Sequence, residues 1–164
     1  WGDENARWAE WGHVNGQYKM KSTQASSLLK RCWLCRKDMK NFRILVTSHL
    51  IQGSGTWGIY FLDKDETWYS LEMDKKGNVA VKKYHSFDNI VLKKTKVPLL
   101  ESNSLLIERV EDSLNAYVND MYIFSVQLDF PSVIDSVGTG LIMTSQSSYP
   151  VEVMFDDFIF WECP

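Results

Sequence analysis

The segment Leu114–Val126 constrains the fold of this chain more than any other. It contains two β-prone runs, Leu114–Val118 and Met121–Val126, separated by the dipeptide Asn119-Asp120. Asn and Asp tolerate the positive φ angles that tight hairpin turns require. The segment therefore predicts a β-hairpin whose side chains alternate between the two faces of a sheet.

Similar runs recur about every ten residues along the chain, with turn residues between them. Phe42–Leu50 alternates apolar and polar residues, which indicates a strand with one apolar face. Trp57–Leu62 is largely apolar, and we expect it to be a central strand buried on both faces. The other expected strands are Gln17–Lys21, Leu28–Leu34, Trp68–Met73, Val79–Tyr84, Ile90–Leu92, Leu105–Val110, Gly138–Thr144 and Val151–Trp161.

No convincing helical segment interrupts this series. Helix propensity is highest at Asn5–Trp11 and Asp38–Asn41, where we expect at most a single turn. This spacing of strands is typical of an all-β sandwich or barrel. A length of 164 residues fits one domain with a substantial core. We therefore predict a single β-sandwich domain over residues 1–164, with residues 1–16 as an entry segment that packs on the sandwich.

Composition excludes some classes of partner. The net charge is -3, so no overall bias towards nucleic acid exists. No apolar run approaches the roughly 18 residues of a transmembrane helix, and no signal peptide is visible. The chain begins at Trp1, so we expect a mature or excised piece of a larger protein. Aromatic residues make up 13%, with seven Trp, which fits either a sandwich core or a surface that stacks on sugar rings.

Seven segments along the chain form a characteristic series. They begin at Gly58 (GIYF), Trp68 (WYSLEM), Gly77 (GNVAVKKY), Asn103 (NSLLIE), Leu114 (LNAYVN), Gly138 (GTGL) and Val153 (VMFDDFI). In this order and spacing they resemble the concanavalin A-like lectin/glucanase superfamily, and within it the laminin G-like jelly rolls of bacterial secreted or surface proteins. The resemblance covers most of the chain from Phe42 to Trp161. Its motifs are structural, so it informs the fold more than any activity.

The resemblance implies two stacked antiparallel sheets with the first and last strands adjacent. A concave sheet face or a rim of loops would then be the binding surface. It also implies an extracellular, periplasmic or cell-surface location. Adjacent terminal strands would bring Cys163 close to the early cysteines.

The catalytic pattern of the glucanases in this superfamily is incomplete here. Those enzymes carry two glutamates on one strand face with an aspartate between them, which places nucleophile and acid for retaining hydrolysis. Glu72-Met73-Asp74 begins this pattern, but Lys75, Lys76 and Gly77 follow, and the second glutamate is missing. The sequence also lacks a nucleophile elbow and a phosphate-binding glycine loop. A non-catalytic domain is therefore favoured.

Sugar binding is the leading expectation. Aromatic rings stack on pyranoses, while carboxylates, amides and hydroxyls bind sugar hydroxyls. Strand phase places Trp68 with Ser70 and Glu72, opposite Tyr69, Leu71 and Met73. The alternative is that Trp68 packs under a loop. Trp57 is expected in the core, because it alternates in step with the apolar residues Ile59 and Phe61. The predicted ligand-binding residues are Trp68, Ser70, Glu72, Lys82 and Tyr84, and Tyr149 is a further aromatic outside the expected core.

Two acidic clusters are candidates for a structural calcium ion. Asp63, Asp65 and Glu66 lie in one loop, and Asp156-Asp157 lie in the last strand. Neither segment matches an EF-hand, because the required Gly and distal Glu are absent. Alternation predicts that one of Asp156 and Asp157 points inward, where its carboxylate needs a hydrogen-bonding partner and would fix a neighbouring loop.

The three cysteines leave alternatives open. Cys32 and Cys35 form a C-x-x-C pair, and Cys163 is close to the C-terminal end of the sequence. A disulfide between Cys163 and one of the pair implies an oxidising compartment. Three buried free thiols are the alternative, and a zinc site would need one of the histidines, His13, His49 or His85, as a further ligand.

Seven lysines crowd into one segment with few acids, and they predict a basic patch if their strands are neighbours. Such a patch could attract an anionic polysaccharide, a phospholipid headgroup or an acidic partner, or it could be a solvated face that guards an edge strand. These lysines are Lys75, Lys76, Lys82, Lys83, Lys93, Lys94 and Lys96.

The leading functional hypothesis is a non-catalytic carbohydrate-binding or surface-recognition module of a larger extracytoplasmic protein, with a glycan or cell-surface polysaccharide as partner. A glycoside-processing enzyme that uses Glu72 and Asp74, like the glucanases or 3-keto-glycoside hydrolases, is the second. A laminin G-like adhesion or assembly domain that binds another protein or another domain of the same polypeptide is the third.

Overall fold

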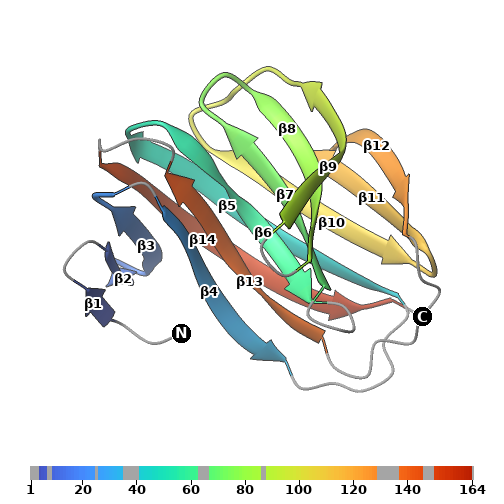
Figure 1. The fold of residues 1–164 in the computed structure, drawn as a ribbon, viewed down its shortest axis with the longest axis horizontal. Helices are drawn as coiled ribbons and strands as arrows, with labels where there is room; N and C mark the ends of the chain where they lie inside the picture. Colours follow the sequence, from blue (N-terminus) through green and yellow to red (C-terminus); the bar gives the residue numbers. More distant parts are fainter. Residues whose placement is uncertain are drawn as a thin grey trace.

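The computed structural model describes residues 4–6, 9–24, 26–34, 41–62, 67–85, 88–128, 137–145 and 150–163, and these form two antiparallel sheets packed face to face. None of the described residues is helical, so this part of the chain holds no helix able to cross a bilayer. Figure 1 shows the two layers, with the N-terminal strands beside one end of the sandwich. The prediction of an all-β sandwich is confirmed.

The first sheet has eight strands in the order β1-β2-β3-β14-β5-β10-β11-β12. The last strand therefore lies between an early strand and the long strand β5. The strands are β1 (Glu4–Ala6), β2 (Ala9–Val14), β3 (Gln17–Ser22), β14 (Val151–Glu162), β5 (Phe42–Gln52), β10 (Asn103–Val110), β11 (Ser113–Val118) and β12 (Met121–Gln127).

The second sheet has six strands in the order β4-β13-β6-β7-β8-β9. Strands β6 to β9 are consecutive in the sequence, pair antiparallel with one another and make up four of the six strands of this layer (Figure 1). The strands are β4 (Ser26–Leu34), β13 (Val137–Ser145), β6 (Gly55–Leu62), β7 (Thr67–Asp74), β8 (Asn78–His85) and β9 (Asp88–Lys96).

The core lies between the two sheets and is built by alternation along the strands. Phe42, Ile44 and Val46 of β5 are fully buried, as the period of two predicts. Phe42 meets Phe61 of the opposite sheet edge-to-face at 5.2 Å between ring centroids. Phe61 in turn stacks on Tyr69 at 5.4 Å. Aromatic contacts of this kind add to the burial of apolar surface that holds the layers together.

The hairpin at Leu114–Val126 forms as predicted. Strands β11 and β12 pair directly, and Asn119 and Asp120 both have positive φ angles, of 51° and 62°. Two consecutive residues with positive φ define the tight turn that Asn and Asp favour. The Asn119 side chain also accepts a hydrogen bond from the backbone N–H of Ser104 at 2.9 Å, which ties the turn to β10.

Three sequence expectations about strands are wrong. Residues 4–6 and 9–14 form strands β1 and β2, where the sequence predicts at most a single helical turn. Strand β9 is nine residues long, not three, because an exposed, lysine-rich edge strand shows no apolar period. In β14 a bulge between Asp156 and Ile159 breaks the alternation, and the exposed Asp157 adopts a φ of 50°, so neither aspartate points inward.

Candidate functional site

The outer face of the six-stranded sheet, which points away from the core, carries the predicted ligand-binding residues. Trp68, Ser70 and Glu72 of β7 share this face, since Tyr69, Leu71 and Met73 are buried in the core. Register places Trp68 opposite Tyr84 of β8, and Ser70 opposite Lys82. The structure therefore brings all five predicted residues together on two adjacent strands.

Glu72 is the centre of this cluster, and its residue is only 1% exposed. Oε1 accepts hydrogen bonds from the hydroxyls of Ser70 at 2.6 Å and Tyr84 at 2.7 Å. Oε2 accepts from the Thr56 hydroxyl at 2.5 Å and from Lys82 Nζ at 2.7 Å. Four donors occupy the four lone-pair positions of the carboxylate, which compensates for the cost of burying a charge.

Lys82 supplies the counter-charge, and its side chain is only 16% exposed. Burial raises the pKa of Tyr84 well above its ordinary value, and the Glu72 charge and its hydrogen bond add to the rise. Tyr84 therefore keeps its proton and remains a hydrogen-bond donor to Glu72. Together these groups form a rigid polar network on a sheet surface.

An aromatic row runs across β6, β7 and β8 beside this network. Trp68 stacks face to face on Tyr84, with 3.6 Å between ring centroids and 4° between ring planes. Tyr60 meets Trp68 edge-to-face at 5.6 Å. Trp68 thus contacts both Tyr60 and Tyr84, and Tyr84, which lies opposite Asn89 of β9, is partly exposed at the β9 side of the row.

Glycine at position 58 is required for the close packing of β6 and β7 at this site. Gly58 lies directly opposite Glu72. A Cβ on Gly58 would lie 1.9 Å from the backbone oxygen of Leu71. No side chain fits there without moving main-chain atoms, so the strand next to Glu72 stays free of a covering side chain.

A cavity of about 410 Å³ lies at one end of this face, between the turn before β6 and the turn after β7. Thr56, which donates to Glu72, connects the cavity to the network. Burial raises the pKa of Asp74, but hydrogen bonds from the Asn78 side chain and the backbones of Asn78 and Lys76 outweigh this effect and lower it. The other residues that line this cavity are Ser54, Gly55, Asp74, Lys75 and Lys76.

Sequence reasoning missed Thr56 and Tyr60, which come from β6. Tyr60 belongs to the run Trp57–Leu62, which the apolar pattern assigns to the interior, and it is indeed 1% exposed, whereas Thr56 precedes that run. Only the register of β6 against β7, with Thr56 opposite Asp74 and Tyr60 opposite Ser70, places them at the site. Trp57 is a core residue, as expected, and its indole N–H donates to Ser48 Oγ at 3.0 Å.

The remaining predicted sites are less well defined. Asp63, Asp65, Glu66, Cys35 and Tyr149 lie outside the described residues, as does the side chain of Cys32. Cys163 carries a free thiol rather than a disulfide. The end of β14 pairs with β5, and Cys32 lies on β4 of the other sheet. Within the described ranges, no group of three or more His, Cys, Asp or Glu could hold a metal ion.

A second buried glutamate lies on the outer face of the eight-stranded sheet. Glu108 forms an ion pair with Arg43, whose Nε donates at 2.7 Å, and accepts hydrogen bonds from Tyr117 at 3.0 Å and Asn115 at 3.2 Å. Burial raises the pKa of Glu108, but these hydrogen bonds outweigh that effect and lower it. The Arg43 side chain is 43% exposed, so water still solvates the cation. This cluster joins three neighbouring strands.

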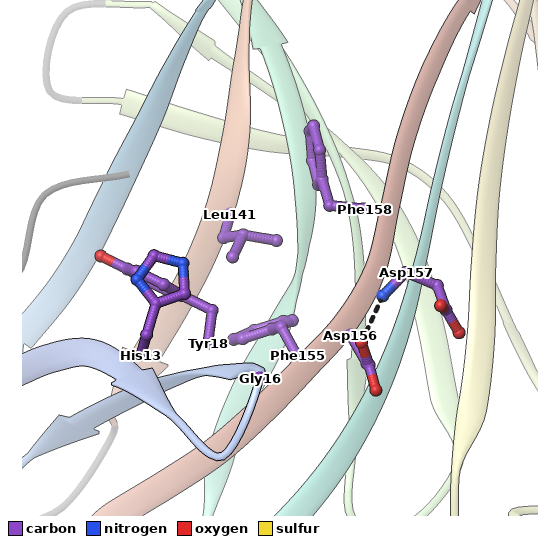
Figure 2. Close-up of a pocket in the computed structure, with 8 residues that line it drawn as sticks. All are labelled: His13, Gly16, Tyr18, Leu141, Phe155, Asp156, Asp157 and Phe158. Atoms are coloured by element: carbon purple, nitrogen blue, oxygen red, sulfur yellow. Dashed lines mark hydrogen bonds between the residues drawn. The ribbon is translucent and has the colours of Figure 1, made fainter.

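A smaller cavity, of about 140 Å³, lies between the β2–β3 turn and the bulge in β14 (Figure 2). His13 meets Tyr18 edge-to-face at 5.1 Å on one side, and Asp156 and Asp157 lie on the other. Asp156 accepts a hydrogen bond from Gln17 Nε2 at 3.1 Å, which links β14 to the start of β3. Ligand pockets usually exceed roughly 300 Å³, so this cavity is small for a sugar.

No family model and no curated sequence matches the chain. Solved structures do match it. The carbohydrate-binding module CBM66 from Bacillus subtilis has a TM-score of 0.71 at 18% identity, covering 94% of this chain and 92% of that one. A protein of unknown function with a galectin-like fold from Bacillus subtilis has a TM-score of 0.72 at 8% identity, covering 94% of this chain and 86% of that one. These matches show a jelly-roll β-sandwich fold of the kind found in carbohydrate-binding modules, glucanases and galectin-like proteins.

Enzymes share this fold as well. The catalytic domain of an endo-1,3-beta-glucanase from Thermotoga petrophila matches with a TM-score of 0.66 at 12% identity, covering 98% of this chain and 82% of that domain. The TM-scores establish a shared sandwich fold. Because the sequence identities are so low, the activity has to be argued from the site itself. Both binding modules and enzymes that act on carbohydrates are thus among the structural neighbours.

Proposed function

We propose that this domain is a non-catalytic carbohydrate-binding module and that it binds a glycan on the outer face of β7 and β8. The observation that carries the proposal is the stacked pair Trp68–Tyr84 next to Lys82 and the Glu72 network. A sugar ring stacks on the partly exposed Tyr84 ring, while Lys82, which uses one donor on Glu72, offers further N–H groups to sugar hydroxyls. The presence of a carbohydrate-binding module among the structural neighbours supports this assignment.

The state of Glu72 favours binding over catalysis. A glycosidase nucleophile or acid needs a carboxyl oxygen that can reach the substrate. Both oxygens of Glu72 are saturated by protein donors and shielded from solvent. Its role in our proposal is to orient Lys82 and Tyr84, which makes it a positioning residue.

Secreted carbohydrate-active proteins commonly use such modules, so we also propose an extracytoplasmic location for the parent protein. A module of this kind concentrates its protein on a polysaccharide surface. The adhesion-domain alternative predicts capture of a protein partner instead, and it has no specific support from the site.

Affinity electrophoresis tests the proposal. Purified protein is run in gels that contain laminarin, dextran or alginate, and retardation by at least one polysaccharide is expected. Tyr84→Ala and Trp68→Ala should abolish retardation. Tyr122→Ala is the matched control, because Tyr122 is 58% exposed on the outer face of the other sheet.

Urea denaturation of each variant separates loss of binding from loss of folding. Release of reducing ends from the same polysaccharides by the wild type would instead establish an enzyme. Equal loss of retardation in Tyr84→Ala and Tyr122→Ala, with both variants folded, would place the binding surface elsewhere.

A further inference from the structure

A basic patch extends from the proposed glycan site to the edge of the six-stranded sheet. We define it as Lys75, Lys76, Lys94 and Lys96. Strand β9 is the outermost strand of this sheet, and all of its residues except Leu92 are exposed. Lys94 lies opposite Ala80 and Lys96 opposite Asn78. Ala80 in turn lies opposite Glu72, so Lys94 shares the face of the proposed site.

The acids on this face do not neutralise the patch. Glu72 is already paired with Lys82. The Asp74 carboxylate accepts hydrogen bonds from the backbone N–H groups of Lys76 and Asn78 and from the Asn78 side chain. Lys94 and Lys96 make no ion pair with any residue that the structure describes. A protein with a net charge of -3 therefore concentrates positive charge here.

The cavity beside Thr56 continues the patch at the end of the face. Lys75 and Lys76 line it together with Ser54 and Gly55. Hollow, positively charged surfaces raise the local concentration of anions. Lysines on an edge strand also oppose pairing between two copies of the chain, because the charges would repel. The face is thus open to a partner of opposite charge.

We propose that the glycan is anionic, with carboxylate or sulfate groups that bind the basic patch while one sugar ring stacks on Tyr84. This inference rests on the proposed function. Tyr84 and Ala80 are four residues apart on β8, a distance of about 13 Å, and Lys94 lies one strand further, about 5 Å away. The ligand is therefore an oligomer of several sugars, since a monosaccharide at Tyr84 does not reach Lys94 and Lys96.

Isothermal titration with three polysaccharides tests the inference: alginate, carboxyl-reduced alginate and dextran sulfate. We expect alginate or dextran sulfate to bind at least tenfold more tightly than the reduced, neutral polymer, and added salt to weaken that binding. Preference for alginate over dextran sulfate would identify carboxylates as the recognised groups, and the reverse would identify sulfates.

The Lys94→Gln/Lys96→Gln double variant should weaken binding of the anionic polymer about tenfold, which corresponds to two exposed ion pairs. Lys19→Gln/Lys21→Gln is the matched control, since it removes the same charge from β3 of the other sheet. Its affinity should be unchanged.

Equal affinity for alginate and its reduced form, or equal behaviour of the two double variants, would overturn the inference. If Tyr84→Ala still abolishes binding in that case, the proposed glycan site stands without its anionic preference. Binding of none of the polymers would refute both proposals. Lysine-dependent binding that survives Tyr84→Ala would also refute them, because it would be charge attraction without the aromatic site.

Discussion

The buried ion pair between Glu72 and Lys82 makes the stability of the candidate site predictable. Glu72→Gln keeps the size of the side chain but removes the charge, and its NH2 group cannot accept hydrogen bonds from Lys82 or Thr56. Lys82, only 16% exposed, is then left as a buried cation without its counter-ion. Breaking a buried pair from one side costs about 3–5 kcal/mol. We expect about 3 kcal/mol, because the amide oxygen still accepts hydrogen bonds.

Urea denaturation followed by tryptophan fluorescence measures this loss, which corresponds to a fall in Tm of about 6–12 °C at this chain length. Glu108→Gln is the control, since it breaks the same kind of pair where the cation, Arg43, is 43% exposed. That variant should cost about 1 kcal/mol. Adding Lys82→Met to Glu72→Gln should recover part of the loss, because it removes the unpaired charge. An equal loss of stability in Glu72→Gln and Glu108→Gln, or no recovery of stability in the double variant, would show that burial of the cation does not determine the cost of breaking the pair.

The other predictions concern the turn, the glycine and the titration of the site. Asn119→Ala should lower the free energy of unfolding by about 1–2 kcal/mol, because Asn119 has a positive φ and accepts a hydrogen bond from the Ser104 N–H. Asp120→Gly should leave stability nearly unchanged, because glycine adopts a positive φ without strain. The midpoints of urea denaturation compare the two variants. Gly58→Ala should prevent folding or cost more than about 3 kcal/mol, as far-UV circular dichroism would show, since its Cβ meets a backbone oxygen. The lowered pKa of Glu108 stabilises the fold above about pH 4.5, and this contribution is lost as the pH falls through the folded-state pKa. In Glu108→Gln, the free energy of unfolding should therefore fall less steeply as the pH is lowered below about 4.5. The raised pKa of Tyr84 predicts that stability falls as the pH rises above about 10, and that Tyr84→Phe reduces this fall.

Local patterns in the sequence predict strands well wherever one face is buried. The alternation of Trp68, Ser70 and Glu72 against Tyr69, Leu71 and Met73 identifies the outer face of β7 correctly, because a period of two is a local property. The turn at Asn119 and Asp120 is equally local, and both residues have the expected backbone conformation.

Features that depend on pairing between distant strands could not be predicted in this way. Thr56 and Tyr60 reach the site only through the register of β6 against β7. Strand β2 gains its order from backbone pairing with β3 rather than from an apolar period. The bulge after Asp156 reverses the expected side-chain direction, and a simple alternation rule has no means to anticipate an inserted residue.

Chemical-shift mapping on ¹⁵N-labelled protein is the most direct test of whether a glycan binds the outer face of β7 and β8. An oligosaccharide of the polymer that retards the protein would be titrated into the sample. The account predicts that the shifts concentrate on the indole N–H of Trp68 and on the backbones of β7, β8 and β9 around Tyr84, Lys82 and Lys94. Shifts concentrated instead on β5, β10 and β11 around Arg43, Glu108 and Tyr117 would contradict it, because the ligand would then occupy the outer face of the other sheet.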